Sequence, residues 1–230
     1  MTENVITVIG NGDSGSGGAA GRRDSTPSLR LLMTLAAAGM LAGLLIVVAY
    51  QLTLPRIERN RAARLEAAVL EVVPHSVRFD PLYLYQGKLV KEPPPAVDRK
   101  KLDAVYLAYD AAGKKVGYAI LSGDPGFADV VDVLFGYQPG QREILGMKAL
   151  EQKETPGLGS RIETDTKFIE GFQGAVAPLH GVHAGMEKTK NDVDVITGAT
   201  ISSKTVIRAI NKGEAKWGPL ITAWEKGGGS

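Results

Sequence analysis

Residues 103–150 of this 230-residue chain read DAVYLAYDAAGKKVGYAILSGDPGFADVVDVLFGYQPGQREILGMKAL, and this stretch decides the fold class. Four runs within it, at residues 103–109, 116–122, 129–137 and 143–150, are rich in the β-branched and aromatic residues typical of strands. Aspartate, glycine and proline fill the breaks between the runs, where they favour tight turns. We therefore predict antiparallel strands, of which the first two form a β-hairpin.

The segments around these strands predict helices and irregular structure. Residues 162–172 suit a short helix, and residues 194–197 end a last strand. Residues 201–212 carry isoleucine and valine at helical spacing and suit a second helix. Residues 75–100 are rich in proline and are expected to be irregular. A run of strands with helices at its edges predicts an α+β fold.

The longest apolar run, residues 31–54, contains no charged side chain. At ~1.5 Å per residue, a helix of this length spans a hydrocarbon core of ~30 Å. The run is longer than the apolar core of a cleaved signal peptide. We therefore predict an uncleaved transmembrane helix over residues 28–54. The arginines on its two sides are nearly balanced in number, so they do not decide its orientation.

The composition of the other segments predicts four further parts of the chain. Residues 1–27 are rich in glycine, serine, asparagine and aspartate and are expected to form a disordered tail. Residues 55–74 are amphipathic and predict a juxtamembrane helix that ends at Pro74. Residues 75–226 would form the globular domain, and residues 227–230, GGGS, resemble the remnant of a linker that does not belong to the fold.

The overall composition excludes several classes of function. Hydrophobic residues make up 44% of the chain, charged residues 23%, and the net charge is +2, so no nucleic-acid partner is expected. The absence of cysteine rules out disulfides, iron–sulfur clusters and thiol catalysis. Of three histidines, His180 and His183 are close in sequence, but we expect two loop side chains rather than a metal site. A redox role would therefore require an organic cofactor.

Residues 194–204, DVITGATISSK, are the first of two segments that suggest chemistry. They predict the end of a strand, a tight turn at Gly198 and Ala199, and the start of a helix. Free backbone N–H groups and the helix dipole favour an anion at such a start. A phosphate linked to Thr200 would suit this position, although a threonine there is more often a simple helix cap.

The second segment is residues 154–160, ETPGLGS, in which two glycines flank a single leucine after a proline. Such a loop can bring backbone N–H groups and one apolar side chain against a flat ligand. Taken alone, the segment fits a surface turn better than a binding loop.

The two segments together resemble a known family. The pattern D-x-x-[ST]-G-A-[ST] is the motif recognised by a flavin transferase that moves FMN from FAD onto the last hydroxyl residue. The chain resembles the G subunit of the Rnf ion-translocating electron-transport complex and its relative, the C subunit of the sodium-translocating NADH:quinone reductase. In both families ETPGLG precedes this motif by some forty residues, as Glu154 precedes Asp194 here. The resemblance covers roughly residues 30–215, including the juxtamembrane segment LTLPRIERN.

The resemblance implies a covalent FMN and assigns roles to individual residues. Thr200 would carry FMN through a phosphoester. The rest of the transferase motif would be Asp194, Thr197, Gly198 and Ala199. The isoalloxazine or phosphate would be lined by Glu154, Thr155, Gly157, Leu158 and Gly159. Lys204 would lie near the phosphate or on a solvated helix face. Residues 123–128 depart from the family's commoner G-Y-G-G form, which leaves a contact from Phe127 open.

The function that the resemblance implies is electron relay within a membrane complex that couples ferredoxin–NAD oxidoreduction to Na⁺ or H⁺ transport. The expected partners are other membrane and redox subunits, the flavin transferase and membrane lipid. The FMN-binding domain, residues 75–226, would lie on the extracytoplasmic side of the cytoplasmic membrane, with the tail in the cytoplasm. No general acid, base or nucleophile is evident, so no independent catalytic activity is expected.

Three alternatives stay open at this point. The chain could be an FMN-binding electron donor to a different extracytoplasmic reductase. It could be related more directly to the C subunit of the NADH:quinone reductase. It could also be an anchored binding module in which TGAT only caps a helix.

Overall fold

The computed structural model describes residues 28–183, 185–187 and 189–228 of the chain. The chain forms two compact units, Met1–Pro55 and Arg56–Ser230. The predicted tail at residues 1–27 and the last two residues of the predicted linker lie outside the described residues.

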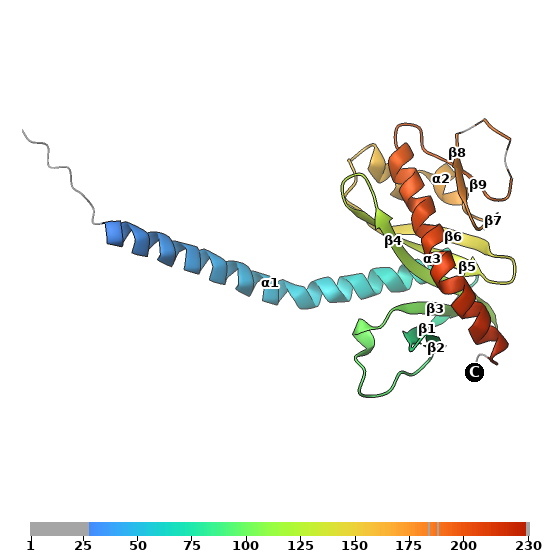
Figure 1. Cartoon of the computed structure of the whole chain (residues 1–230), viewed down its shortest axis with the longest axis horizontal. Helices are drawn as coiled ribbons and strands as arrows, with labels where there is room; N and C mark the ends of the chain where they lie inside the picture. The colour runs from blue at the N-terminus through green and yellow to red at the C-terminus, as the bar shows by residue number, and fades with distance from the viewer. Residues whose placement is uncertain (1–27, 184, 188, 229–230) are drawn as a thin grey trace, which may run out of the picture. The chain divides into compact units, whose positions relative to one another are not determined.

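One helix, α1 (Ser28–Val72), contributes to both units (Figure 1). In the first unit most of its side chains are apolar and exposed, and the helix is long and apolar enough to cross a membrane. Pro55 lies inside α1, so the structure has one helix where the sequence suggests two in succession. Proline removes one backbone hydrogen bond, and the residues on both sides still keep helical geometry.

The second unit is built on a seven-stranded antiparallel sheet with the order β2-β1-β3-β4-β5-β6-β7. Its strands are β1 (Arg78–Tyr85), β2 (Lys88–Val90), β3 (Ala104–Tyr109), β4 (Lys115–Pro125), β5 (Val130–Gln138), β6 (Glu143–Glu151) and β7 (Ala175–Val176). The four predicted strands correspond to β3–β6. The predicted hairpin is confirmed, because β3 pairs antiparallel with β4 and Leu107 lies opposite Tyr118.

The prediction that residues 75–100 are irregular is wrong for β1 and β2 and is confirmed for residues 91–98, which form no helix or strand. Proline normally argues against a strand, and Pro81 lies in the middle of β1. Pro81 faces Tyr106 of β3 on one side, whereas β2 pairs only with Tyr83–Tyr85. In the described part of the chain no strand pairs with the other side of β1 at Pro81, and a residue without an N–H is tolerated at such an edge.

All but one of the remaining elements follow β6. The predicted helix at residues 162–172 is divided into η2 (Gly159–Glu163) and α2 (Thr166–Glu170), with Asp165 capping α2 through the Phe168 N–H. A small parallel sheet pairs β8 (His180–Val182) with β9 (Asp192–Asp194). The last helix, α3 (Thr200–Lys226), is more than twice as long as the predicted helix and continues through Pro219. The short helix η1 (Arg99–Lys101) precedes β3.

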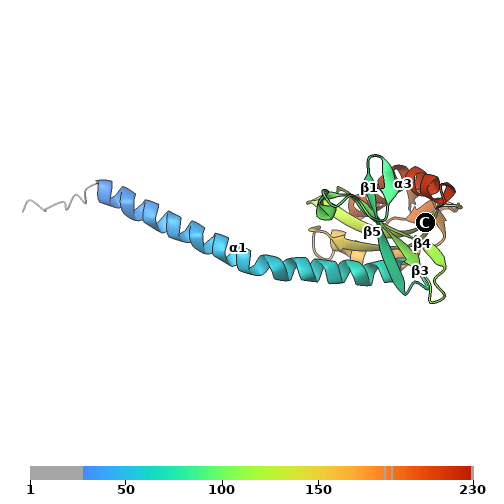
Figure 2. The same ribbon diagram turned by 90° about the horizontal axis from the view of Figure 1, so that it is seen from below.

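The sheet is covered on both faces, as Figure 2 shows for α3 on one side and the second half of α1 on the other. Ala68, Val69 and Val72 of α1 pack against Ala119 and Leu134 of the sheet. A Cβ on Gly136 of β5 would lie 2.0 Å from the Val72 carbonyl oxygen, so this glycine permits the close approach. The face under α3 holds the larger core, including Ile120, Phe135, Val206 and Ile210. The α+β prediction is confirmed.

Candidate functional site

A pocket of about 380 Å³ brings together the two segments that the sequence singles out. A third segment, the turn between β4 and β5, joins them. Residues 127, 154–159 and 198–202 supply the walls: Phe127, Glu154, Thr155, Leu158, Gly159, Gly198, Ala199, Thr200, Ile201 and Ser202. The volume falls in the range of small-molecule sites, ~300–1,000 Å³. Most of the predicted site residues therefore line one cavity.

Thr200 is the first residue of α3, and its side chain does not cap the helix. The N-cap position is Ala199, which makes no side-chain capping bond. Within the described residues the Thr200 hydroxyl has no hydrogen-bond partner, and the residue is half-buried in the pocket wall. The first N–H groups of a helix also have no partner inside it. The start of α3 therefore presents a free hydroxyl beside free amides.

The turn before α3 is held in place by Ser203. Its hydroxyl accepts a hydrogen bond of 3.0 Å from the Ile196 N–H and donates one of 2.9 Å to the Ala199 carbonyl. Gly198 has φ +84°, a left-handed conformation that glycine adopts without strain. These contacts fix the direction in which the chain enters α3, and therefore the position of Thr200.

Glu154 ties the three walls of the pocket together. Its Oε1 accepts hydrogen bonds from the Phe127 N–H at 2.9 Å and the Ala128 N–H at 3.0 Å. The Ser202 hydroxyl donates to its Oε2 at 2.5 Å. Only 4% of Glu154 is exposed. Burial acts to raise the pKa of Glu154, but the bonds from Ser202 and the backbone amides outweigh it and lower that pKa.

Two glycines allow the chain to pass close to this carboxylate. A Cβ on Gly126 would lie 2.5 Å from Glu154 Oε1, and a Cβ on Gly159 would lie 2.7 Å from Ser202 Oγ and 2.8 Å from Glu154 Cβ. Both contacts are shorter than packed atoms tolerate. The second glycine of ETPGLG is therefore needed for close packing against the start of α3.

Three exposed apolar side chains stand at the rim of the pocket. The exposed fractions are 70% for Phe127, 53% for Leu158 and 55% for Ile201. Each comes from a different wall. Such a rim suits a flat apolar ring, because aromatic and aliphatic side chains can pack on its two faces. Of these residues the sequence singled out only Leu158 for a role at the site.

The other four predicted site residues do not line the pocket. Gly157 has φ +76°, and its N–H binds Ser160 Oγ at 2.9 Å. The Thr197 carbonyl accepts from Arg161 at 3.4 Å, and Asp194 ends β9. Lys204 is exposed, and a Cβ on Gly181 would lie 3.5 Å from its Cγ. Its stem therefore lies toward β8.

Besides Phe127 and Ile201 at the rim, the sequence motifs did not indicate Ser202 and Arg161 as contributors. Ser202 binds Glu154, and Arg161 joins the loop after β6 to the turn before α3 by reaching the Thr197 carbonyl. Ser202 is the second of three hydroxyl residues at the start of α3, which is the signal that could have indicated it.

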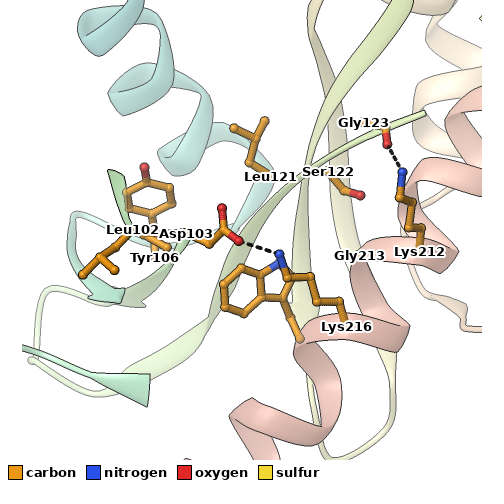
Figure 3. A pocket seen from close by; sticks show the side chains of 11 residues that line it. Leu102, Asp103, Tyr106, Leu121, Ser122, Gly123, Lys212, Gly213 and Lys216 are labelled. Carbon is orange, nitrogen blue, oxygen red and sulfur yellow. Dashed lines mark hydrogen bonds and ion pairs between the residues drawn. The ribbon is translucent and has the colours of Figure 1, made fainter. Parts of the chain in front are cut away.

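A second hollow of about 380 Å³ lies between β3, β4 and α3 (Figure 3). Its cations are already engaged: Lys216 reaches Asp103 at 2.7 Å, and Lys212 donates to the Gly123 carbonyl at 3.0 Å. Gly123 belongs to the end of β4 that follows Ile120, where β4 pairs with β5 but no longer with β3. This hollow contains none of the predicted site residues.

Among the residues described, no group of three or more His, Asp and Glu side chains is arranged to hold a metal ion. His180 lies on β8 with Asp192 3.8 Å away, and His183 is exposed just after the strand. The two histidines thus lie on a strand and at its end.

Comparison with known proteins agrees with this geometry. The model of the FMN-binding domain family matches residues 126–213, which include all three walls of the pocket. The G subunit of the ion-translocating oxidoreductase complex of Pseudomonas aeruginosa (strain UCBPP-PA14) is 31% identical over 202 residues, covering 84% of this chain and 89% of that protein.

The chain belongs to the family of G subunits of ion-translocating oxidoreductase complexes.

The G subunit of Methanosarcina acetivorans is also similar to the chain, at 27% identity over 82% of this chain and 93% of the relative. Among solved structures, NqrC of Shewanella oneidensis matches with a TM-score of 0.51 at 20% identity, covering 64% of this chain and 85% of that one. This likeness concerns the fold. The assignment to the G-subunit family therefore rests on the sequence relatives.

Proposed function

We propose that this G subunit carries FMN joined to Thr200 by a phosphoester and relays electrons within an ion-translocating ferredoxin:NAD oxidoreductase complex. The observation that carries the proposal is the Thr200 hydroxyl, which is unpartnered among the described residues and lies in the pocket wall at the start of α3. A threonine that served only as a helix cap would occupy the N-cap position and bind a backbone N–H.

The residues of the pocket fit FMN in two respects. The free amides and positive dipole end of α3 suit the phosphate. The apolar rim of Phe127, Leu158 and Ile201 suits one or both faces of the isoalloxazine, and Thr155 and Gly159 complete the wall beside it. When bound, FMN supplies the ability to accept and release one or two electrons. The protein's residues position the ring and exclude water around it.

Attachment to Thr200 is a group transfer from FAD. The bond between Thr200 Oγ and the FMN phosphorus forms, the pyrophosphate bond of FAD breaks, AMP leaves, and the hydroxyl proton passes to the base that the transferase provides. We assign Asp194, Thr197, Gly198 and Ala199 to transferase recognition, because they form or adjoin the turn that presents Thr200. Gly157 shapes the 154–159 loop, and Lys204 is close enough in sequence to add positive charge near the phosphate.

The first half of α1 is proposed to anchor the protein in the cytoplasmic membrane, with residues 75–226 on the extracytoplasmic side as the FMN-binding domain. Its exposed apolar side chains would then contact lipid or the membrane helices of partner subunits. The relatives are named as subunits of an ion-translocating complex, which supports further membrane and redox subunits as partners.

Co-expression with a flavin transferase tests the proposal. After denaturing electrophoresis the native chain should keep yellow-green flavin fluorescence, and Thr200→Ala should lose it. Thr200→Ser keeps a hydroxyl at the same position and should retain part of the label. A native chain without retained flavin from cells that contain the transferase would overturn the proposal. Co-purification of several polytopic subunits with the tagged chain would test its place in the complex.

A further inference from the structure

Glu154 supplies the only formal charge among the ten residues that line the Thr200 pocket. The other nine are threonine, serine, glycine, alanine and apolar side chains. Because Glu154 is buried, water screens its charge poorly. An ionised carboxylate in such a place has a strong influence on any redox group beside it.

No cation neutralises this carboxylate within the described part of the chain. Its partners are the Ser202 hydroxyl and the backbone amides of residues 127–129, all of them neutral donors. The nearest cations along the chain are engaged elsewhere: Lys153 binds Asp129 at 2.6 Å, and Arg161 binds Asp165 at 2.6 Å. The hydrogen bonds stabilise the negative charge without removing it.

The same carboxylate is fixed in position. Backbone amides bind its Oε1 and the Ser202 hydroxyl binds its Oε2. Gly126 and Gly159 pack so closely that a Cβ on either would collide with the carboxylate or with Ser202. A charged side chain that cannot turn away or gain water keeps its field directed at the pocket.

We propose that Glu154 is a positioning residue whose fixed negative charge lowers the reduction potential of the flavin attached at Thr200. This rests on the proposed function. An added electron makes the flavin more negative, so a buried carboxylate near the ring disfavours the reduced form by repulsion. Glu154 would thus do more than shape the pocket, and its charge would make the protein a stronger electron donor than an uncharged pocket of the same shape.

Glu154→Gln separates the charge from the shape. Glutamine keeps an oxygen acceptor for the Phe127 and Ala128 amides, and its NH₂ group can donate to the Ser202 hydroxyl. The flavin should remain attached, while the ratio of reduced to oxidised flavin at a fixed potential should rise about tenfold, or ~30 mV for a two-electron couple. Glu154→Ala removes the anchor as well and should lower the fraction of chain that carries flavin.

The experiment is a redox titration of full-length, flavinylated protein in detergent, followed by visible absorbance. Glu163→Gln is the matched control, because it removes the same charge from an exposed residue of η2 that does not line the pocket. Ser202→Ala is the second test, because it removes one neutral donor and leaves the charge less compensated. The reduction potential of the flavin in Ser202→Ala should be lower than in the native protein, whereas Glu154→Gln should raise it.

Each outcome bears on one proposal. A higher potential in Glu154→Gln, with Glu163→Gln unchanged, supports the charge effect. A flavin-labelled Glu154→Gln protein with the reduction potential of the native protein overturns the charge effect and leaves the proposed attachment at Thr200 intact. Should Glu154→Gln not accept flavin, an unchanged or raised potential in Ser202→Ala overturns it instead. A native chain that carries no flavin overturns the proposed function and is recognised before any titration.

Discussion

The hydroxyl of Ser203 accepts a hydrogen bond from the Ile196 N–H at 3.0 Å, and this bond closes the turn that presents Thr200. The same hydroxyl donates to the Ala199 carbonyl, so one buried side chain links both ends of the turn. Residue 203 thus determines the direction of the chain at residue 200 without lining the pocket itself.

Ser203→Ala should destabilise the domain and loosen the position of Thr200. The substitution leaves the buried Ile196 N–H without its partner, which costs about 1–3 kcal/mol. We expect a lower urea midpoint and a smaller fraction of flavin-labelled chain after co-expression with the transferase. Ser76→Ala is the control, because among the described residues the Ser76 hydroxyl donates only to the Val73 carbonyl, outside the pocket. Equal labelling of Ser203→Ala and native protein would contradict the role of this bond.

Gly159→Ala should obstruct the pocket from within. Its methyl group would meet Ser202 Oγ at 2.7 Å and Glu154 Cβ at 2.8 Å, which forces the loop away from α3. Overpacking of this kind costs about 1–3 kcal/mol. The labelled fraction should fall together with stability. At Gly140, where no atom lies within 4 Å of an added Cβ, alanine should change neither quantity. A labelled, fully stable Gly159→Ala protein would show that the close approach is not needed.

Arg142 and Glu214 should contribute to stability without affecting flavin attachment. Arg142 binds the largely buried Glu214 through two hydrogen bonds of 2.9 and 2.8 Å, and the Tyr137 hydroxyl also reaches that carboxylate. Burial and the Glu214 charge raise the pKa of Tyr137 to about 12. Arg142→Ala leaves Glu214 without its cation and should lower the free energy of unfolding by about 2 kcal/mol. A decrease of less than about 0.5 kcal/mol in the free energy of unfolding of Arg142→Ala would contradict this assignment. A smaller share of flavin-labelled chain in the folded protein would also contradict it.

Glu154 should make the stability of the domain depend on pH in the acidic range. Despite burial, its hydrogen bonds hold its folded-state pKa below the ordinary range of a glutamate. A carboxyl with a lowered pKa stabilises the fold above its unfolded pKa, and this stabilisation is lost as pH falls through the folded pKa. Chemical unfolding of native protein and Glu154→Gln at pH 7 and at successively lower pH values measures the effect. The difference between the two should shrink below pH ~4.3, the unfolded pKa of glutamate; a constant difference would contradict it.

The sequence anticipates most of the sheet because β3–β6 follow the ordinary strand pattern. It misses β1 because a proline normally argues against a strand. Pro81 pairs with β3 alone, and β2 begins its pairing with β1 only at Tyr83. It ends the last helix too early because Gly213, Gly218 and Pro219 suggest a break. In the structure Gly213 is a packing position: a Cβ there would lie 2.8 Å from the Phe135 ring. A glycine needed by a distant partner cannot be distinguished from a helix breaker by local pattern.

At the site, the two motifs indicate that residues 154–159 and 198–200 belong together, and the structure places them in one pocket. They do not reveal Phe127 or Ser202. Phe127 lies 27 residues before Glu154, and its position depends on the bonds that Glu154 makes to the turn between β4 and β5. Contacts of this kind arise from the folded arrangement of strands and leave no periodic signal in the chain.

The central claim is the covalent link at Thr200, and peptide mass spectrometry of the full-length protein tests it most directly. The protein should be isolated from cells that contain the flavin transferase and then digested. We predict that the peptide containing Thr200 carries the added mass of FMN less one water, with fragment ions that assign it to residue 200. An unmodified Thr200 peptide, or flavin mass on Ser202 or Ser203 instead, would contradict it.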